Sequence, residues 1–258
     1  MKQLKFLMVA FTLLMGVSLT SCMGESDPTV SWATFMRVVE TYPFYTFQAA
    51  DGVKFVATNS SELQSMSSKI NYNDIVYVQY AYNSDEQQVT NETKSIDAKM
   101  TLYYNASSAS RSITEEGNGA GEPYENATVI DMYPATKGGL TYFDKNTLLL
   151  CVRYMAQKDL SLHNFTLVYD NTVEENAEDG VLNLYLRHSN TEEKPDQTVD
   201  GYFRAFDITD FLYQYGKTPT KIKVWINETD KSGSYKLEDA KKELQSYEVD
   251  YKSVFEKN

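Results

Sequence analysis

Few side chains in this sequence have the type and spacing that chemistry requires. Two histidines, His163 and His188, occur in 258 residues, and neither lies in the HxH or HExxH pattern that brings two imidazoles to one zinc ion. The sequence also lacks the GxSxG motif of hydrolases, the P-loop and the GxGxxG motif. We therefore expect no catalytic residue, no bound metal and no cofactor, and a protein that is not an enzyme.

Carboxylates gather in residues 170–179, where two Asp and three Glu are found. A calcium ion needs several converging oxygen ligands, and this segment carries enough of them. The D-x-D-x-D-G spacing of an EF-hand loop is missing, however. A solvated loop between two strands is the favoured interpretation, and calcium binding is the alternative.

Two aromatic residues, Tyr185 and Trp225, are the candidate surface binding residues. Leucines alternate with Tyr185 along residues 182–186, and aliphatic residues alternate with Trp225 along residues 222–226. In a strand this alternation places both aromatic rings on the face opposite the aliphatic stripe. Exposed rings stack on sugars or fill a partner's pocket. The alternative is that they cover the second face of a sheet or a contact between domains.

The two cysteines have different surroundings. Cys151 lies in an apolar, strand-like run over residues 147–156, which predicts a buried structural thiol. Cys22 follows Leu19, Thr20 and Ser21 at the end of an apolar N-terminal segment. If Cys22 is used by a lipid, no intramolecular disulfide can form.

The N-terminus has the features of a secretory signal. Lys2 and Lys5 precede an apolar run over residues 6–17, which is too short to span a bilayer, where about 20 residues are needed. The Leu19-Thr20-Ser21-Cys22 segment resembles the lipobox of bacterial lipoproteins. That resemblance implies a signal peptide over residues 1–21, cleavage before Cys22, lipidation of Cys22 and a lipidated tether over residues 22–32. Several acyl chains hold a protein on a membrane where one does not.

Charge excludes one class of partner. The formal net charge is −12, and removal of Lys2 and Lys5 with the signal lowers it to −14. Proteins that bind nucleic acid usually carry a basic stripe, so we expect no nucleic-acid partner. The acidity itself aids solubility.

Strand and turn patterns predict two mainly β domains. Residues 33–105 show the order β-β-β-α-β-β, which is close to that of a small five-stranded OB-like barrel. Residues 106–126 are rich in Ser, Gly and Glu, which predicts a linker or long loop. Residues 127–258 contain seven or eight short strand patterns separated by turn signals, which indicates an antiparallel Ig-like β-sandwich.

This domain order resembles the NigD-like bacterial lipoprotein family. The features that carry the resemblance are the lipobox, the OB-like domain and a sandwich that ends in a Lys-Ile-Lys-Val-Trp-Ile-Asn strand at residues 221–227. The family's founding member lies in a bacteriocin gene cluster and was proposed as an immunity protein. The resemblance implies a non-catalytic binding or envelope-accessory module, with bacteriocin immunity as one version of that role.

The expected location is the outer membrane of a Gram-negative bacterium, through the lipid anchor. Residue 23 is Met and not Asp, which favours sorting to the outer membrane by resemblance to such lipoproteins. The periplasmic and the surface-exposed face remain alternatives. The partner is an unknown protein or a glycan. A glycan-binding accessory of a polysaccharide-uptake system is the second hypothesis, and a hydrolase is the third.

Overall fold

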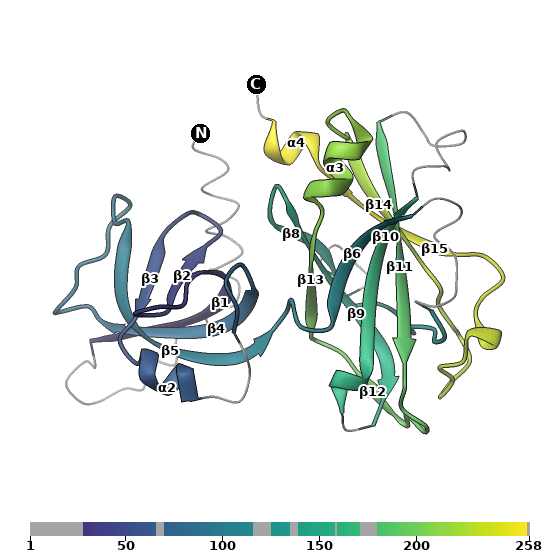
Figure 1. The fold of residues 1–258 in the computed structure, drawn as a ribbon, viewed down its shortest axis with the longest axis horizontal. Helices are drawn as coiled ribbons and strands as arrows, with labels where there is room; N and C mark the ends of the chain where they lie inside the picture. The colour runs from purple at the N-terminus through teal and green to yellow at the C-terminus, as the bar shows by residue number, and fades with distance from the viewer. Residues whose placement is uncertain are drawn as a thin grey trace. The chain divides into compact units, whose positions relative to one another are not determined.

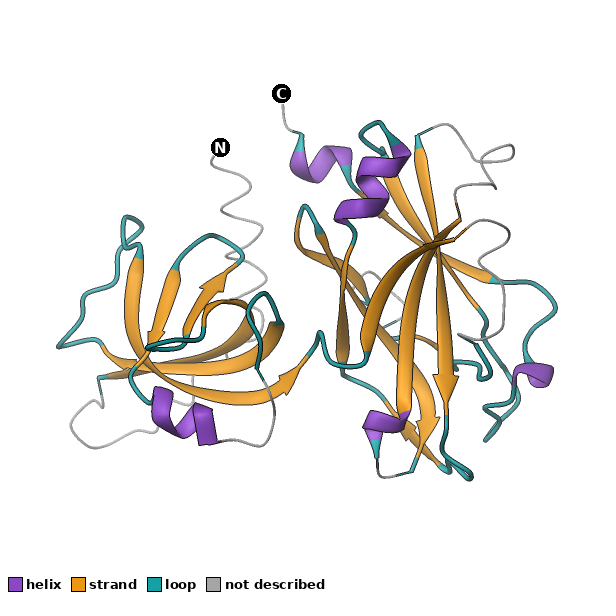
Figure 2. Ribbon diagram, in the orientation of Figure 1, coloured by secondary structure: helices purple, strands orange, loops and turns teal. Residues whose placement is uncertain are grey.

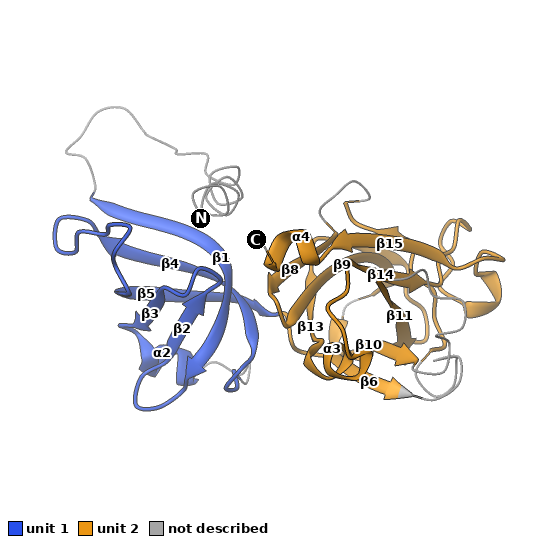
Figure 3. Ribbon diagram, turned by 90° about the horizontal axis from the view of Figure 1, so that it is seen from above, with its two compact units in different colours: residues 1–105 blue, residues 106–258 orange. Residues whose placement is uncertain are grey.

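The protein is described from a computed structural model, which covers residues 28–65, 70–115, 125–134, 139–157, 159–170 and 180–256. The chain divides into two units, residues 1–105 and 106–258, which Figure 3 colours blue and orange. Each unit has its own cluster of buried apolar side chains. The predicted signal peptide and most of the predicted tether lie outside the described residues.

Unit 1 contains a closed five-stranded barrel, labelled in Figure 1. Around the barrel the strands follow the order β1-β2-β3-β5-β4, and β4 pairs with β1. A short helix, α2, lies between the third and fourth strands, as the OB-like order predicted. The bounds are β1 (Thr29–Glu40), β2 (Thr46–Ala49), β3 (Lys54–Ala57), α2 (Ser60–Ser65), β4 (Ile75–Asn83) and β5 (Ser95–Asn105).

The barrel follows from alternation along its strands. In β5, Ile96, Ala98 and Met100 are buried, while the residues between them are exposed. Side chains in a strand point to opposite faces in turn, so one face of β5 fills the barrel and the other meets water. The β2–β3 hairpin turns at Gly52, whose φ of 91° is in the left-handed region that glycine adopts without strain.

Unit 2 has two sheets, and strands make up most of it in Figure 2. The first sheet has the order β15-β14-β11-β10-β6. Its strands are β6 (Ser110–Glu115), β10 (His163–Asp170), β11 (Val181–Asn190), β14 (Lys221–Ile226) and β15 (Gln245–Asp250).

The second sheet is centred on β9 (Thr147–Ala156). β13 and β12 pair with successive parts of β9, and so do β8 and β7. Those strands are β7 (Asp131–Met132), β8 (Leu140–Asp144), β12 (Gln197–Val199) and β13 (Phe203–Asp207). The short helical segments are η1 (Leu160–Leu162), α3 (Thr209–Tyr215), η3 (Leu237–Asp239) and α4 (Lys252–Phe255).

One apolar core joins the two sheets of unit 2. Leu148 and Leu150 of β9 belong to the same buried cluster as Leu184 of β11 and Val224 of β14. Two sheets that bury their facing sides in this way form a sandwich. The mainly β class, a barrel followed by a sandwich, is therefore confirmed.

Some details of the prediction were wrong. β1 begins at Thr29, within the predicted tether, because it pairs with β4 from Thr29↔Asn83 onward. The predicted linker contains β6, which pairs with β10. Its sequence, Ser-Arg-Ser-Ile-Thr-Glu, has a single aliphatic residue, Ile113, and therefore lacks the apolar alternation that marks a strand.

The sequence predicted an antiparallel sandwich, but the first sheet also contains parallel pairs of strands. β6 pairs with β10 in parallel, and β11 pairs with β14 in parallel. Parallel neighbours need a long crossover between them. Here strands of the second sheet provide it: β7, β8 and β9 follow β6, and β12 and β13 follow β11.

No helix in the described part of the chain is long and apolar enough to span a bilayer.

Candidate functional site

The two predicted aromatic residues are direct neighbours on the first sheet of unit 2. Tyr185 of β11 pairs in register with Trp225 of β14. Leu184 and Leu186 flank Tyr185 and are buried in the core, so the aromatic rings lie on the opposite, outer face. Both residues are half-buried, not fully exposed as the sequence suggested.

A cation covers a face of each ring. The Arg187 guanidinium lies 5.3 Å from the centre of the Tyr185 ring, and Nζ of Lys223 lies 5.4 Å from that of Trp225. Trp225 Nε1 donates a hydrogen bond of 2.9 Å to Asn183 Oδ1. Cation–π contacts hold the rings in place and occupy faces that a sugar would use. Trp, Tyr and Arg are the residue types enriched where protein partners bind most tightly.

A buried ion pair lies beside this group. Arg187 Nη1 is 3.3 Å from Glu125 Oε2, and the two side chains are only 4% and 3% exposed. Asn227 Nδ2 donates 2.9 Å to the other oxygen of Glu125. Burial raises the pKa of Glu125, whereas Arg187 and the Asn227 hydrogen bond lower it. We call Glu125, Tyr185, Arg187, Lys223 and Trp225 the outer-face cluster.

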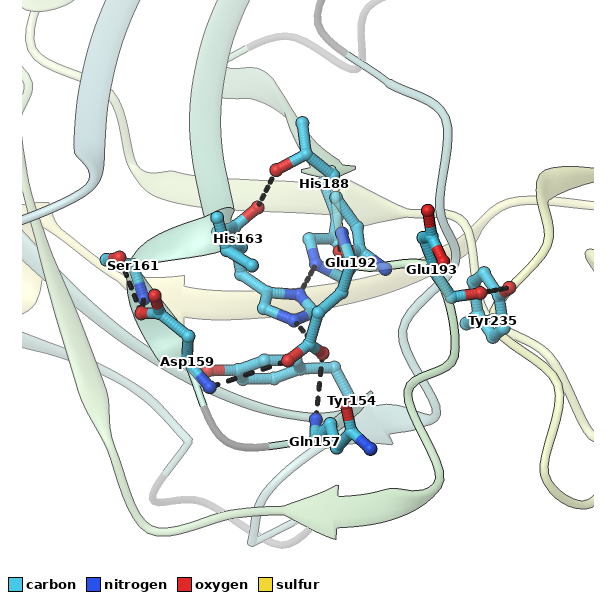
Figure 4. Close-up of polar contacts among 12 residues, drawn as sticks. Tyr154, Gln157, Asp159, Ser161, His163, His188, Glu192, Glu193 and Tyr235 are labelled. Carbon is cyan, nitrogen blue, oxygen red and sulfur yellow. Dashed lines mark hydrogen bonds and ion pairs between the residues drawn. The ribbon is translucent and has the colours of Figure 1, made fainter.

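A second polar group lies inside unit 2, and the sequence analysis did not find it. His163 and His188, which Figure 4 draws as sticks, continue the core-facing stripes of β10 and β11. Phe165 of β10 pairs with His188 of β11. His163 Nδ1 lies 3.0 Å from His188 Nε2, and both residues are almost fully buried. The Phe165 ring stacks on the His188 ring, with centres 4.6 Å apart.

The hydrogen bonds of this group form a line. At one end His188 Nδ1 lies 3.0 Å from the Thr128 carbonyl oxygen, and at the other His163 Nε2 lies 3.1 Å from Glu192 Oε2. Burial lowers the pKa of His188 to about 3, because an imidazolium loses its hydration there. Burial also lowers the pKa of His163, against an opposing contribution from Glu192.

The sequence concealed this pair because the two histidines are far apart and not in a metal-binding pattern. They lie close together because β10 pairs with β11. The long acidic segment between these strands gives no indication of which residues pair. A predicted antiparallel pairing of β10 with β11 would have been the signal. Among the described residues no group of three or more His, Cys, Asp or Glu has the arrangement of a metal site.

The other predicted residues are placed as follows. Cys151 is buried, as predicted, and burial raises its pKa to about 11, so the thiol is protonated and unreactive at neutral pH. Asp170 is buried at the end of β10, and residues 171–179 of the acidic segment lie outside the described residues. Leu19, Thr20, Ser21 and Cys22 of the lipobox also lie outside them.

The fold first defines a class: β proteins in which an OB-like barrel precedes a sandwich. No family model and no curated protein matches the sequence. Solved structures do match, and several come from Bacteroides. A candidate lipoprotein from Bacteroides fragilis is 22% identical with a TM-score of 0.63, over 86% of this chain and 98% of that one. A protein of unknown function from Bacteroides vulgatus is 15% identical with a TM-score of 0.53, over 86% and 91% of the two chains.

A NigD-like immunity protein from Bacteroides caccae is also among the matches. It is 14% identical with a TM-score of 0.44, over 83% of this chain and 92% of that one. At such low identities the likeness extends to the fold alone.

Proposed function

We propose that this chain is a lipid-anchored protein of the outer membrane that acts by binding a partner and not by catalysis. The single observation that carries the binding role is the register pair of Tyr185 and Trp225 on the outer face of the first sheet. The anchor rests on Cys22 and the residues before it.

A protein partner fits the outer-face cluster better than a sugar does. Each aromatic ring already has a cation over one face, which removes a stacking surface from a sugar. Aromatic and Arg side chains at the centre of a patch are the usual anchors of protein interfaces. Lys223 and the two rings offer both positive charge and apolar area, while the charge of Arg187 is paired with Glu125.

Bacteriocin immunity is the version of this function that we propose first. In it, the tethered module would intercept a toxin or its receptor at the cell envelope. The test is to delete the gene and challenge the strain with bacteriocins from related strains. Increased sensitivity, restored by the native gene, supports immunity, and unchanged sensitivity to every bacteriocin contradicts it.

Complementation with variants then tests whether immunity depends on the outer-face cluster. Tyr185→Ala combined with Trp225→Ala should abolish the complementation, while Tyr213→Ala should leave it intact. Tyr213 is a suitable control because it is an aromatic residue of the same unit that is 85% exposed on α3. Equal complementation by all variants would rule out this face as the binding surface.

Glycan capture beside a polysaccharide-uptake system is the second candidate. It is favoured by aromatic residues that are more exposed than the outer-face cluster, namely Tyr42, Phe44 and Tyr72 of unit 1. A glycan array with the soluble chain would support this candidate if binding is lost in Tyr42→Ala combined with Phe44→Ala. No binding on the array would contradict it.

A further inference from the structure

We propose that Glu192, His163 and His188 form an acid-sensitive latch that holds the 191–196 turn, the connection between β11 and β12, against the segment that precedes β10. The proposal does not depend on the proposed function, because the latch lies inside unit 2 and not in the outer-face cluster. It concerns how the fold of this unit responds to pH.

Glu192 is the residue of the turn that makes the contacts of the latch. Its Oε2 accepts a hydrogen bond of 2.8 Å from the backbone N–H of Gln157, and its Oε1 accepts one of 3.4 Å from that of Asp159 (Figure 4). The same carboxylate contacts His163. The Thr191 N–H also donates to the Leu162 carbonyl oxygen, at 3.2 Å. One side chain therefore joins the turn both to the backbone before β10 and to the buried imidazoles.

The contacts of the two imidazoles outnumber the N–H hydrogens that are available to form hydrogen bonds. The line from the Thr128 carbonyl oxygen to Glu192 has three contacts, of 3.0, 3.0 and 3.1 Å. Two neutral imidazoles carry one N–H each and supply two hydrogens. With neutral imidazoles one of the three contacts therefore lacks a hydrogen, and a proton could be added there only as a charge inside the buried line.

The closed structure resists that proton. Tyr154 of β9, Asp159 before η1, His188 of β11, Glu192 and Arg204 of β13 are the titratable and charged groups that face His163. The carboxylates of Glu192 and Asp159 favour a cation there, whereas Arg204 and burial oppose it, and burial is the largest contribution. Arg204 is itself only 8% exposed and lies 5.2 Å from the centre of the Phe165 ring, so its charge is close to the imidazoles and poorly screened.

Opening of the turn reverses this balance. An imidazole in water binds a proton with a pKa of about 6.5. Because the open form binds the proton more readily than the closed form, acid must favour opening. Falling pH should thus release the turn while the rest of the sandwich core stays folded.

The test is hydrogen exchange at the backbone amides of Gln157 and Asp159, measured by NMR on the full mature chain from about pH 8 to 5. Each rate is divided by the intrinsic rate at the same pH, so that only opening is compared. Protection of both amides should fall below about pH 6.5, by at most about tenfold for each pH unit. Protection that is constant or rises with acid would overturn the proposal.

Two variants separate the latch from a structural role. His163→Gln can still donate to Glu192 but cannot titrate, so protection of the two amides should lose its dependence on pH in this range. Glu193→Gln makes a charge change one residue beyond Glu192 on an exposed side chain, and it should keep the native pH profile. A His163→Gln profile that still falls with acid would contradict the latch.

If His163→Gln fails to fold, the latch can be tested on the native protein instead. An NMR titration of the His163 imidazole should then show a midpoint below that of a free histidine, coincident with the loss of amide protection. A midpoint above that of a free histidine would overturn the proposal, because acid would then close the latch.

Discussion

At the scale of single residues, Arg187 and Glu125 form an ion pair whose side chains are only 4% and 3% exposed. A buried ion that loses its partner is costly, because neither water nor an opposite charge compensates it. The ion pair of the outer-face cluster therefore contributes to the stability of unit 2.

Glu125→Ala should lower the free energy of unfolding of unit 2 by about 3–5 kcal/mol. Chemical denaturation followed by tryptophan fluorescence measures this loss. The chain has two tryptophans, and Trp32→Phe leaves only Trp225 as a reporter of unit 2. The control is Glu248→Ala, which removes the partner of Lys221 in a pair that is 40% and 48% exposed.

Loss of the exposed pair should cost no more than about 1 kcal/mol. Equal costs for the two substitutions would contradict the burial of Arg187 and Glu125.

His188 makes the stability of unit 2 depend on pH. Its pKa is about 3 in the folded protein and 6.5 as a free side chain, so the unfolded chain binds the extra proton between these values. Stability is therefore fully present above about pH 6.5 and falls as the pH drops toward 3, by up to about 1.4 kcal/mol for each unit.

Denaturation of each unit at a series of pH values measures this dependence, with Trp225→Phe leaving Trp32 as the reporter of unit 1. Unit 1 is the internal control because both histidines lie in unit 2. Between about pH 7 and 5, unit 2 should lose stability and unit 1 should change little. Parallel losses in the two units would show that His188 is not the cause.

At the scale of elements, β11 and β14 each have one face in the core and one face that carries residues of the outer-face cluster. In β11, Leu184 is completely buried and Tyr185, its neighbour, is half-buried on the opposite face. One face therefore packs in the core, and the other carries the cluster that we propose as a binding surface.

Leu184→Ala should destabilise unit 2 by about 2–5 kcal/mol, because it leaves a cavity that the packed core fills only in part. Lys223→Ala on the outer face of β14 should cost about 1 kcal/mol or less, because it removes one cation–π contact with Trp225. Thermal or chemical denaturation compares the two variants. A larger loss for Lys223→Ala would mean that the assigned faces are reversed.

The same alternation explains how much of the fold the sequence predicts. β11 and β14 alternate clearly, and they contain the alternating residues 182–186 and 222–226 that the sequence analysis singled out. β6 was missed because Ile113 is its single aliphatic residue, and its pairing with β10 depends on a partner far along the chain. The pairing of His163 with His188 was missed for the same reason, since register is a property of two strands together.

At the scale of the whole molecule, the chain has two β units that a lipid at Cys22 would hold at a membrane. Tyr185 and Trp225 were predicted correctly to lie on the outer face, while their neighbours Arg187 and Glu125 came only from the structure. The fold resembles that of a candidate lipoprotein from Bacteroides fragilis. Binding without catalysis is the function that we propose for this fold.

The most direct test of this account is mass spectrometry of the N-terminal peptide, combined with fractionation of the membranes. We expect that the mature chain begins at Cys22, that this residue carries acyl chains, and that the protein is found in the outer membrane. Cys22→Ala should abolish the modification and release the protein. An unmodified N-terminus on a native protein recovered in the soluble fraction would contradict the central claim.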